Sequence, residues 1–248
     1  MVKILVSGFA HCGTSILKSI IGHIEGVYEV PQETQHKDEH VQKMKELGKE
    51  HLVIKTPRLT VIPELNSAVK LHCFSDHTYP TPNPYKDYVV ILIIRDPRYV
   101  VSSFNRRTEK KPGLSDRWLR EYEKMASIYY SLKVNPAQNV YCIQYEKMFD
   151  DNFRRLRYIL DDIGLSYTDA IFDNTQFTNS ISATPRENIA VPENIADHTQ
   201  QGDQFLEYRT WQINQPFQNM NDPTKLNVTV KQEAFITGSK VFAKLRYV

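Results

Sequence analysis

The sequence lacks the features that mark several large classes of protein. Its three cysteines match no metal-ligand spacing, and their odd number argues against a disulfide framework. No apolar run is long enough to span a membrane, and no signal-peptide pattern precedes the apolar residues 2–6. The net charge of +2 argues against a general nucleic-acid-binding face. We therefore expect a soluble, cytoplasmic protein with no membrane span, no metal site and no nucleic-acid partner.

Length and composition favour a single α/β domain over residues 1–248. Apolar residues make up 41% and charged residues 24% of the chain, which suffices for a core without disulfides or metals. Predicted strands and helices alternate, which is typical of three layers around a mostly parallel central sheet. The expected strands are 2–6, 28–30, 51–55, 68–74 and 88–94, and the expected helices are 16–21, 35–47, 99–106 and 116–133.

Three stretches have patterns other than this alternation. Residues 75–87 hold three prolines and predict a long surface loop, and residues 166–225 predict loops and short helices. Residues 225–248 alternate weakly and suggest an edge hairpin through 237–239.

The first motif, Gly8-Phe-Ala-His-Cys-Gly13-Thr14-Ser15, lies between a predicted strand and a predicted helix. It follows the phosphate-loop pattern, with Thr14 in place of the usual lysine. Free backbone N–H groups and the positive helix end make such a turn a ready anion site. An ordinary strand–helix turn is the alternative.

The second motif, Arg95-Asp96-Pro97-Arg98 followed by Ser102-Ser103, also joins a buried strand to a helix. Pro97 suits the first helical position, and Asp96 suits the helix cap. Two anion sites at one edge of a sheet suit a ligand that carries anions at both ends.

These motifs resemble those of the sulfotransferases that use 3′-phosphoadenosine 5′-phosphosulfate (PAPS). Residues 11–15 are similar to the family's 5′-phosphosulfate loop, and Arg95 and Ser103 have the spacing of its 3′-phosphate ligands. Residues 140–149, with Tyr145-Glu146, and residues 156–165 resemble two further family segments. The resemblance covers residues 1 to about 165 and leaves 166–248 uncovered.

The resemblance implies a P-loop-like nucleotide-binding core that moves the sulfuryl group of PAPS to a hydroxyl or amine. The product would be 3′-phosphoadenosine 5′-phosphate (PAP), no metal would be needed, and the enzyme would be a monomer or homodimer. The acceptor would be a small molecule, either a sugar or a phenol. The implied cofactor-binding residues are His11, Cys12, Gly13, Thr14, Ser15, Arg95, Ser103 and Tyr145; for Tyr145, packing on the following helix is the alternative role.

Three residues are implied as catalytic. Lys55 matches a lysine near the sulfate, and His11 stands where relatives have lysine or arginine. The histidine found after the Lys-Thr pair of cytosolic enzymes is replaced here by Pro57, so the chain is closer to the carbohydrate and tyrosylprotein types. In those types a glutamate follows the first helix, which makes Glu33 the expected general base, with His36 and His40 as weaker candidates.

Two other functions remain open at this point. A phosphate-loop kinase would need a lysine in the loop and an acidic magnesium ligand, for which Asp96 is the one tempting residue. A non-catalytic nucleotide-binding module would explain His11 but would leave Glu33 and Lys55 without a role.

Overall fold

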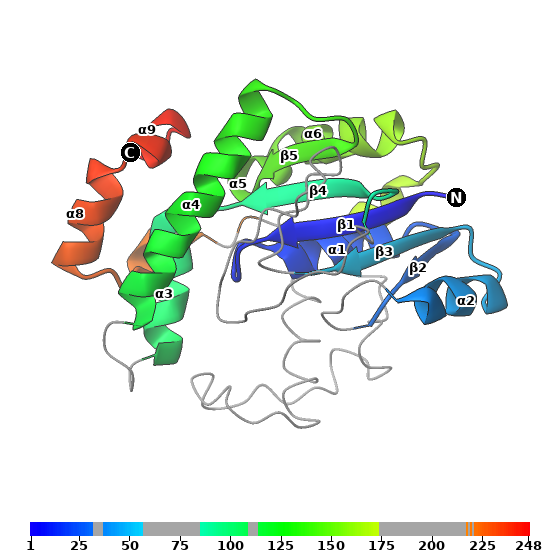
Figure 1. Cartoon of the computed structure of the whole chain (residues 1–248), viewed down its shortest axis with the longest axis horizontal. Helices are drawn as coiled ribbons and strands as arrows, with labels where there is room; N and C mark the ends of the chain where they lie inside the picture. Colours follow the sequence, from blue (N-terminus) through cyan, green and yellow to red (C-terminus); the bar gives the residue numbers. More distant parts are fainter. Residues whose placement is uncertain (32–36, 57–84, 109–113, 174–216, 218, 220) are drawn as a thin grey trace.

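The protein is built on a five-stranded parallel sheet (Figure 1). The computed structural model describes residues 1–31, 37–56, 85–108, 114–173, 217, 219 and 221–248. The strand order is β2-β3-β1-β4-β5, and all four pairings are parallel. The strands are β1 (Lys3–Gly8), β2 (Val27–Glu29), β3 (His51–Lys55), β4 (Val89–Ile94) and β5 (Val140–Gln144).

The central strands owe their place to continuous apolar runs. Ile4, Leu5 and Val6 of β1 have no exposed surface, and the residues of β4 from 90 to 94 are buried as well. A parallel sheet covered on both faces requires such runs, because neither face meets water. The strands predicted at 2–6, 28–30, 51–55 and 88–94 are thus confirmed to within about a residue or two, whereas 68–74 lies outside the described residues.

Helices cover both faces of the sheet, as expected of a three-layer α/β fold (Figure 1). Helices α1 and α6 lie on one face and α4 on the other. Helix α4 packs on the core through one face, since Tyr122, Met125 and Tyr129 are all buried. The helices before the C-terminal segment are α1 (Thr14–Gly22), α2 (Asp38–Glu46), α3 (Pro97–Thr108), α4 (Leu114–Val134), α5 (Tyr145–Met148) and α6 (Asp150–Asp162), followed by the 3₁₀ turn η1 (Asp169–Phe172).

The C-terminal hairpin expected from the sequence is wrong. After the 3₁₀ turn η4 (Pro223–Lys225), the chain forms helices α8 (Val230–Gly238) and α9 (Lys240–Lys244). The Thr229 hydroxyl accepts a hydrogen bond from Gln232 N at 3.2 Å, and the Gln232 side chain accepts one from Thr229 N at 3.1 Å. This reciprocal capping box starts a helix, and the Ser239 hydroxyl caps α9 in turn. Local side-chain capping therefore outweighs the weak period-two pattern.

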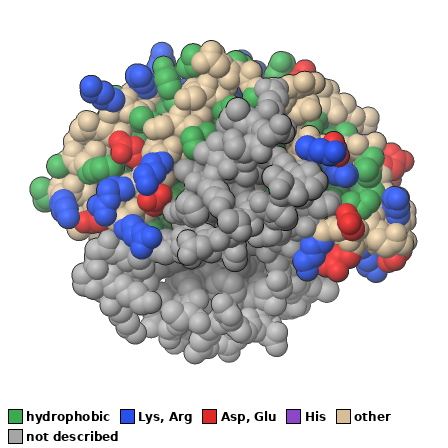
Figure 2. Space-filling model, viewed as in Figure 1, with side chains coloured by type: hydrophobic (Ala, Val, Ile, Leu, Met, Phe, Trp, Pro, Cys, Tyr) green, Lys and Arg blue, Asp and Glu red, His purple; other side chains and the backbone are tan. Residues whose placement is uncertain are grey.

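The described surface carries charges of both signs. Basic and acidic side chains are interspersed over the described parts of the face in Figure 2, in keeping with the small net charge. Among the described helices, none is both long and apolar enough to cross a lipid bilayer. The expected loops at 75–84 and over most of 166–216 fall on residues that the structure does not describe.

Candidate functional site

The predicted phosphate loop leads from β1 into α1 at the carboxyl edge of the sheet. Gly13 precedes α1 with a φ of 92°, a left-handed conformation that favours glycine. A Cβ on Gly13 would lie only 2.3 Å from the Tyr145 ring, so packing also demands glycine here. Thr14 and Ser15 follow in the first turn of α1, where the backbone N–H groups are free for an anion.

Cys12 belongs to this loop through its backbone. Its side chain is fully buried, and burial raises the pKa of its thiol to about 12, which keeps it protonated. The Cys12 N–H donates to the Phe9 carbonyl at 3.2 Å, which shapes the turn.

Lys55 brings a cation to the loop from the neighbouring strand. It ends β3, which pairs with β1 so that Lys55 lies beside Val6, just before the loop. Its ammonium group donates to the Ser15 hydroxyl at 2.6 Å, and the residue is only 4% exposed. The charge missing from the loop sequence is therefore supplied by the adjacent strand.

Arg95 follows β4 and lies against both the loop and β5. Its guanidinium donates to the His11 carbonyl at 3.2 Å and lies 4.3 Å from the centre of the Tyr145 ring. Its Nε donates to Asn221 at 2.7 Å. Arg95 and His11 are 84 positions apart in the sequence, so the two motifs meet in the folded protein.

The His11 side chain contacts α3. Its Nδ1 lies 2.9 Å from the Ser103 hydroxyl, and its ring packs edge-on against Phe104 at 4.7 Å between centroids. With a φ of 69°, its backbone is also in the left-handed region. The structure therefore groups His11 with Arg95 and Ser103, and groups Lys55 with Ser15.

Tyr145 begins α5 directly after β5. It is 1% exposed, covers Gly13, and meets Phe149 edge-on with ring centroids 5.1 Å apart. The Tyr145 ring therefore packs against the junction between α5 and α6, and its alternative role from sequence, packing on the following helix, stays a prediction. Contact with a nucleotide base remains a prediction.

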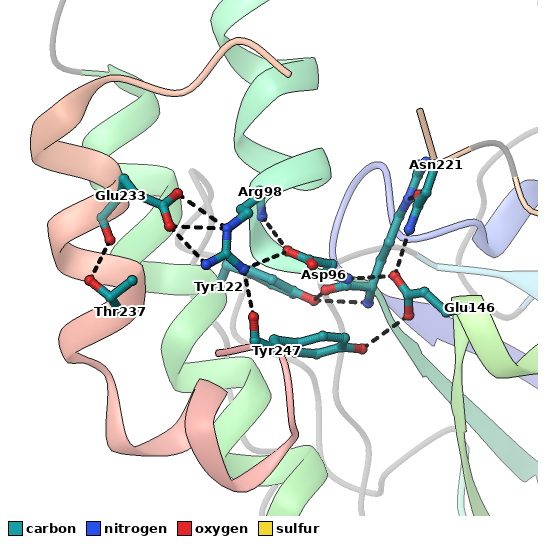
Figure 3. Close-up of polar contacts among 9 residues, drawn as sticks. Asp96, Arg98, Tyr122, Glu146, Asn221, Glu233, Thr237 and Tyr247 are labelled. Carbon is teal, nitrogen blue, oxygen red and sulfur yellow. Dashed lines mark hydrogen bonds and ion pairs between the residues drawn. The ribbon is translucent and has the colours of Figure 1, made fainter. Parts of the chain in front are cut away.

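A polar network joins the segments that follow β4 and β5 to α4 and to the C-terminal segment (Figure 3). The Glu146 carboxylate accepts from Asp96 N at 2.8 Å, from the Asn221 amide at 2.9 Å and from the Tyr247 hydroxyl at 3.3 Å. The Tyr122 hydroxyl accepts from Arg95 N at 2.9 Å and donates back to the Arg95 carbonyl. The backbone around Arg95 is held on both sides.

Asp96 has the structural role expected of it. Its carboxylate accepts from Arg98 N at 2.8 Å, which caps α3. Burial raises the pKa of Asp96, while its bond to Arg98 N and the Arg98 charge oppose that rise. Arg98 also binds Glu233 in α8 through bonds of 2.7–3.2 Å, which ties the C-terminal helices to this edge.

Sequence reasoning missed Asn221, Glu233 and Tyr247. All three belong to the C-terminal region that the family resemblance does not cover, and no motif surrounds them. Glu146 carried a signal in the Tyr-Glu pair but was given no role. The candidate bases Glu33 and His36 lie outside the described residues, and His40 lies in α2.

Comparisons with known proteins agree with this geometry. A profile of the sulfotransferase family matches residues 85–169, a range that contains Arg95, Ser103 and Tyr145. No curated protein matches the sequence.

Two solved structures are similar to this chain over most or all of its length. The mouse sulfotransferase SULT7A1, complexed with PAP, matches with a TM-score of 0.54 and 18% identity, covering 100% of this chain and 89% of that one. Retinol dehydratase in complex with androsterone and PAP matches with a TM-score of 0.44 and 14% identity, covering 90% and 83%. The chain is thus similar to the sulfotransferase family over residues 85–169 and shares its fold with a solved sulfotransferase.

Proposed function

We propose that this protein transfers the sulfuryl group of PAPS to a hydroxyl or amine of a small acceptor. The observation that carries the proposal is the meeting of two separate candidate anion-binding groups at one edge of the sheet. One consists of the turn into α1 with Lys55 and Ser15, and the other of Arg95 with Ser103. A nucleotide with phosphate groups at both its 5′ and 3′ positions has the matching charges.

The residues that surround the phosphate loop fit PAPS better than they fit a nucleoside triphosphate with magnesium. A magnesium site would call for a carboxylate aimed at the phosphates, and Asp96 instead caps α3 and faces Arg98. Arg95 suits a phosphate because its planar guanidinium offers paired N–H donors. The PAP-complexed mouse relative supports the same choice of ligand.

When bound, PAPS supplies an activated sulfuryl group whose departure leaves PAP. The chain must then hold the donor in line with the acceptor and stabilise the negative charge that develops on the leaving phosphate. The N-terminus of α1 and the Lys55 ammonium group stabilise that negative charge. Arg95 and Ser103 hold the other end of the nucleotide and thereby fix its register.

His11 has two possible tasks in this scheme. Its ring faces Ser103, which suits contact with the 3′-phosphate end. The catalytic role that the family resemblance implies for it, at a position where relatives have lysine or arginine, would instead put positive charge at the departing 5′-phosphate. Substituting lysine separates the two, because a lysine that restores positive charge at the leaving group would preserve or raise activity.

Removal of the acceptor proton is assigned to Glu33 on the family resemblance alone. Glu33 follows β2 in the sequence and lies outside the described residues. The proposal has four further parts. The enzyme is closer to the carbohydrate and tyrosylprotein types, and its acceptor is a sugar or a phenol. It is cytoplasmic, and it is a monomer or a homodimer.

Ligand binding and turnover test the proposal together. PAP should raise the melting temperature without magnesium, and ATP with magnesium should do so much less. Incubation with PAPS and a panel of sugars, phenols and amines should release PAP in step with a sulfated product. A larger thermal shift with ATP and magnesium would favour the kinase, and PAP binding without turnover of any acceptor would favour a binding module.

A further inference from the structure

The guanidinium of Arg95 is held on several sides. It stacks over Tyr145 at 4.3 Å, lies 5.5 Å from the Tyr99 ring centre, and donates through Nη1 to the His11 carbonyl at 3.2 Å. Its Nε donates to the Asn221 side-chain oxygen at 2.7 Å. Among the described residues, no hydrogen-bond partner is recorded for Nη2.

The Asn221 amide is oriented by its second partner. Its Nδ2 donates to the Glu146 carboxylate at 2.9 Å, and that carboxylate also accepts from Asp96 N (Figure 3). A carboxylate only accepts, so the amide must turn its NH₂ toward Glu146 and its oxygen toward Arg95. Asn221 thus connects the arginine to the strand end that carries Glu146.

This arrangement decides which edge of the guanidinium is available. An arginine can grip an oxyanion side-on through Nε and Nη2, or end-on through Nη1 and Nη2. Because Asn221 occupies Nε, only the Nη edge remains, and Nη1 already points at the loop beside His11. A phosphate bound end-on there would lie on the side of the loop where His11 contacts Ser103.

We propose that Asn221 is a positioning residue that orients Arg95 for end-on contact with the 3′-phosphate of the nucleotide. The inference rests on the proposed function, since it concerns the same ligand. It gives the C-terminal segment a part in selecting 3′-phosphorylated nucleotides. Asn221 acts through Arg95 and does not itself bind the phosphate.

A double-mutant cycle on PAP binding tests this coupling. Calorimetry would give the PAP dissociation constant for the wild type, Asn221→Ala, Arg95→Ala and the double variant. A hydrogen bond to a charged group predicts about a tenfold weaker affinity for Asn221→Ala. In the Arg95→Ala background the same change should cost less than about twofold, because the residue through which Asn221 acts is gone.

A matched control separates positioning from general loosening of the C-terminal segment. Asn105 donates to the Asn227 carbonyl at 2.6 Å and to Gln232 at 2.9 Å, so it anchors the same segment without touching Arg95. Asn105→Ala should lower the melting temperature and leave PAP affinity within about twofold of the wild type. Asn221→Asp keeps the acceptor for Nε but places a negative charge beside Glu146 and the phosphate, so it should also weaken PAP binding.

The outcomes distinguish the two proposals. If the wild type does not bind PAP, the proposed function fails. If Arg95→Ala loses PAP affinity but Asn221→Ala keeps it, the proposed function stands and the positioning role is wrong. Equal losses from Asn221→Ala in both backgrounds would also overturn the positioning role, since the effect would then not pass through Arg95.

Discussion

Replacing Lys55 by Met removes the cation at the phosphate loop while keeping a side chain of similar length. The Lys55 ammonium lies 2.6 Å from the Ser15 hydroxyl and is almost fully buried, so the loop retains its backbone donors but loses its charge. A unit charge about 4 Å from an oxyanion is worth about 4 kcal/mol at an effective dielectric constant of about 20.

Only the part of that energy that grows toward the transition state affects the rate. Loss of one such stabilising group typically lowers kcat by about 10²–10³-fold, or about 2.7–4 kcal/mol. We expect a fall of this size for Lys55→Met, with a smaller loss of PAP affinity because Arg95, Ser103 and the loop amides remain. Single-turnover rates with PAPS and a productive acceptor would measure the first effect, and calorimetry with PAP the second.

A matched control uses the same substitution on an exposed helix. Lys43 in α2 has a side chain that is 56% exposed and pairs with Glu46, so Lys43→Met should leave the rate within about twofold. If Lys55→Met keeps more than about a tenth of the wild-type rate, the charge at the loop does not come from Lys55. The search would then turn to His11.

Three further outcomes are expected. Glu33→Gln should lower turnover about a hundredfold or more with PAP affinity little changed, and full activity would exclude Glu33 as the base. Lys18→Met should lower the free energy of unfolding by about 3–5 kcal/mol in denaturant melts, because Lys18 pairs with the buried Glu29 at 3.2 Å. Adding Glu29→Leu should recover most of the loss, because no unpaired buried charge then remains. A loss below about 1 kcal/mol for Lys18→Met alone would contradict this reasoning. His51 accepts from Val2 N, and burial lowers its pKa, so the folded state binds fewer protons than the unfolded state. Stability should therefore fall as the pH drops through about 6.5, and melting temperatures should show a flatter profile for His51→Asn.

Local chemistry in the sequence was enough to predict the central fold. The apolar runs of β1 and β4 place apolar side chains on both faces of each strand, and both faces are shielded from water only inside a parallel sheet covered by helices. The glycine at 13 and the Asp-Pro pair at 96–97 mark where the two strands turn into helices. These signals act over a few residues, so they can be read without knowing the rest of the structure.

The C-terminal helices show where such reading fails. A weak alternation from Leu226 to Val230 suggested strands, but the capping box of Thr229 and Gln232 starts a helix there. The helix then gains a long-range anchor, because Glu233 reaches Arg98 across 135 positions of sequence. A helix cap and a charge-assisted ion pair together stabilise the helix more than a weak alternation of a few apolar residues stabilises a strand.

The sequence by itself determined which residue types stand at the two strand–helix turns, and hence predicted an anion site at each turn. Only the tertiary structure decided how these residues combine: the register of β3 against β1 brings Lys55 to Ser15, and His11 turns toward Ser103. The same holds for Asn221, which meets Arg95 from 126 positions away. Such pairings depend on strand order and packing between distant segments, and no local sequence pattern encodes them.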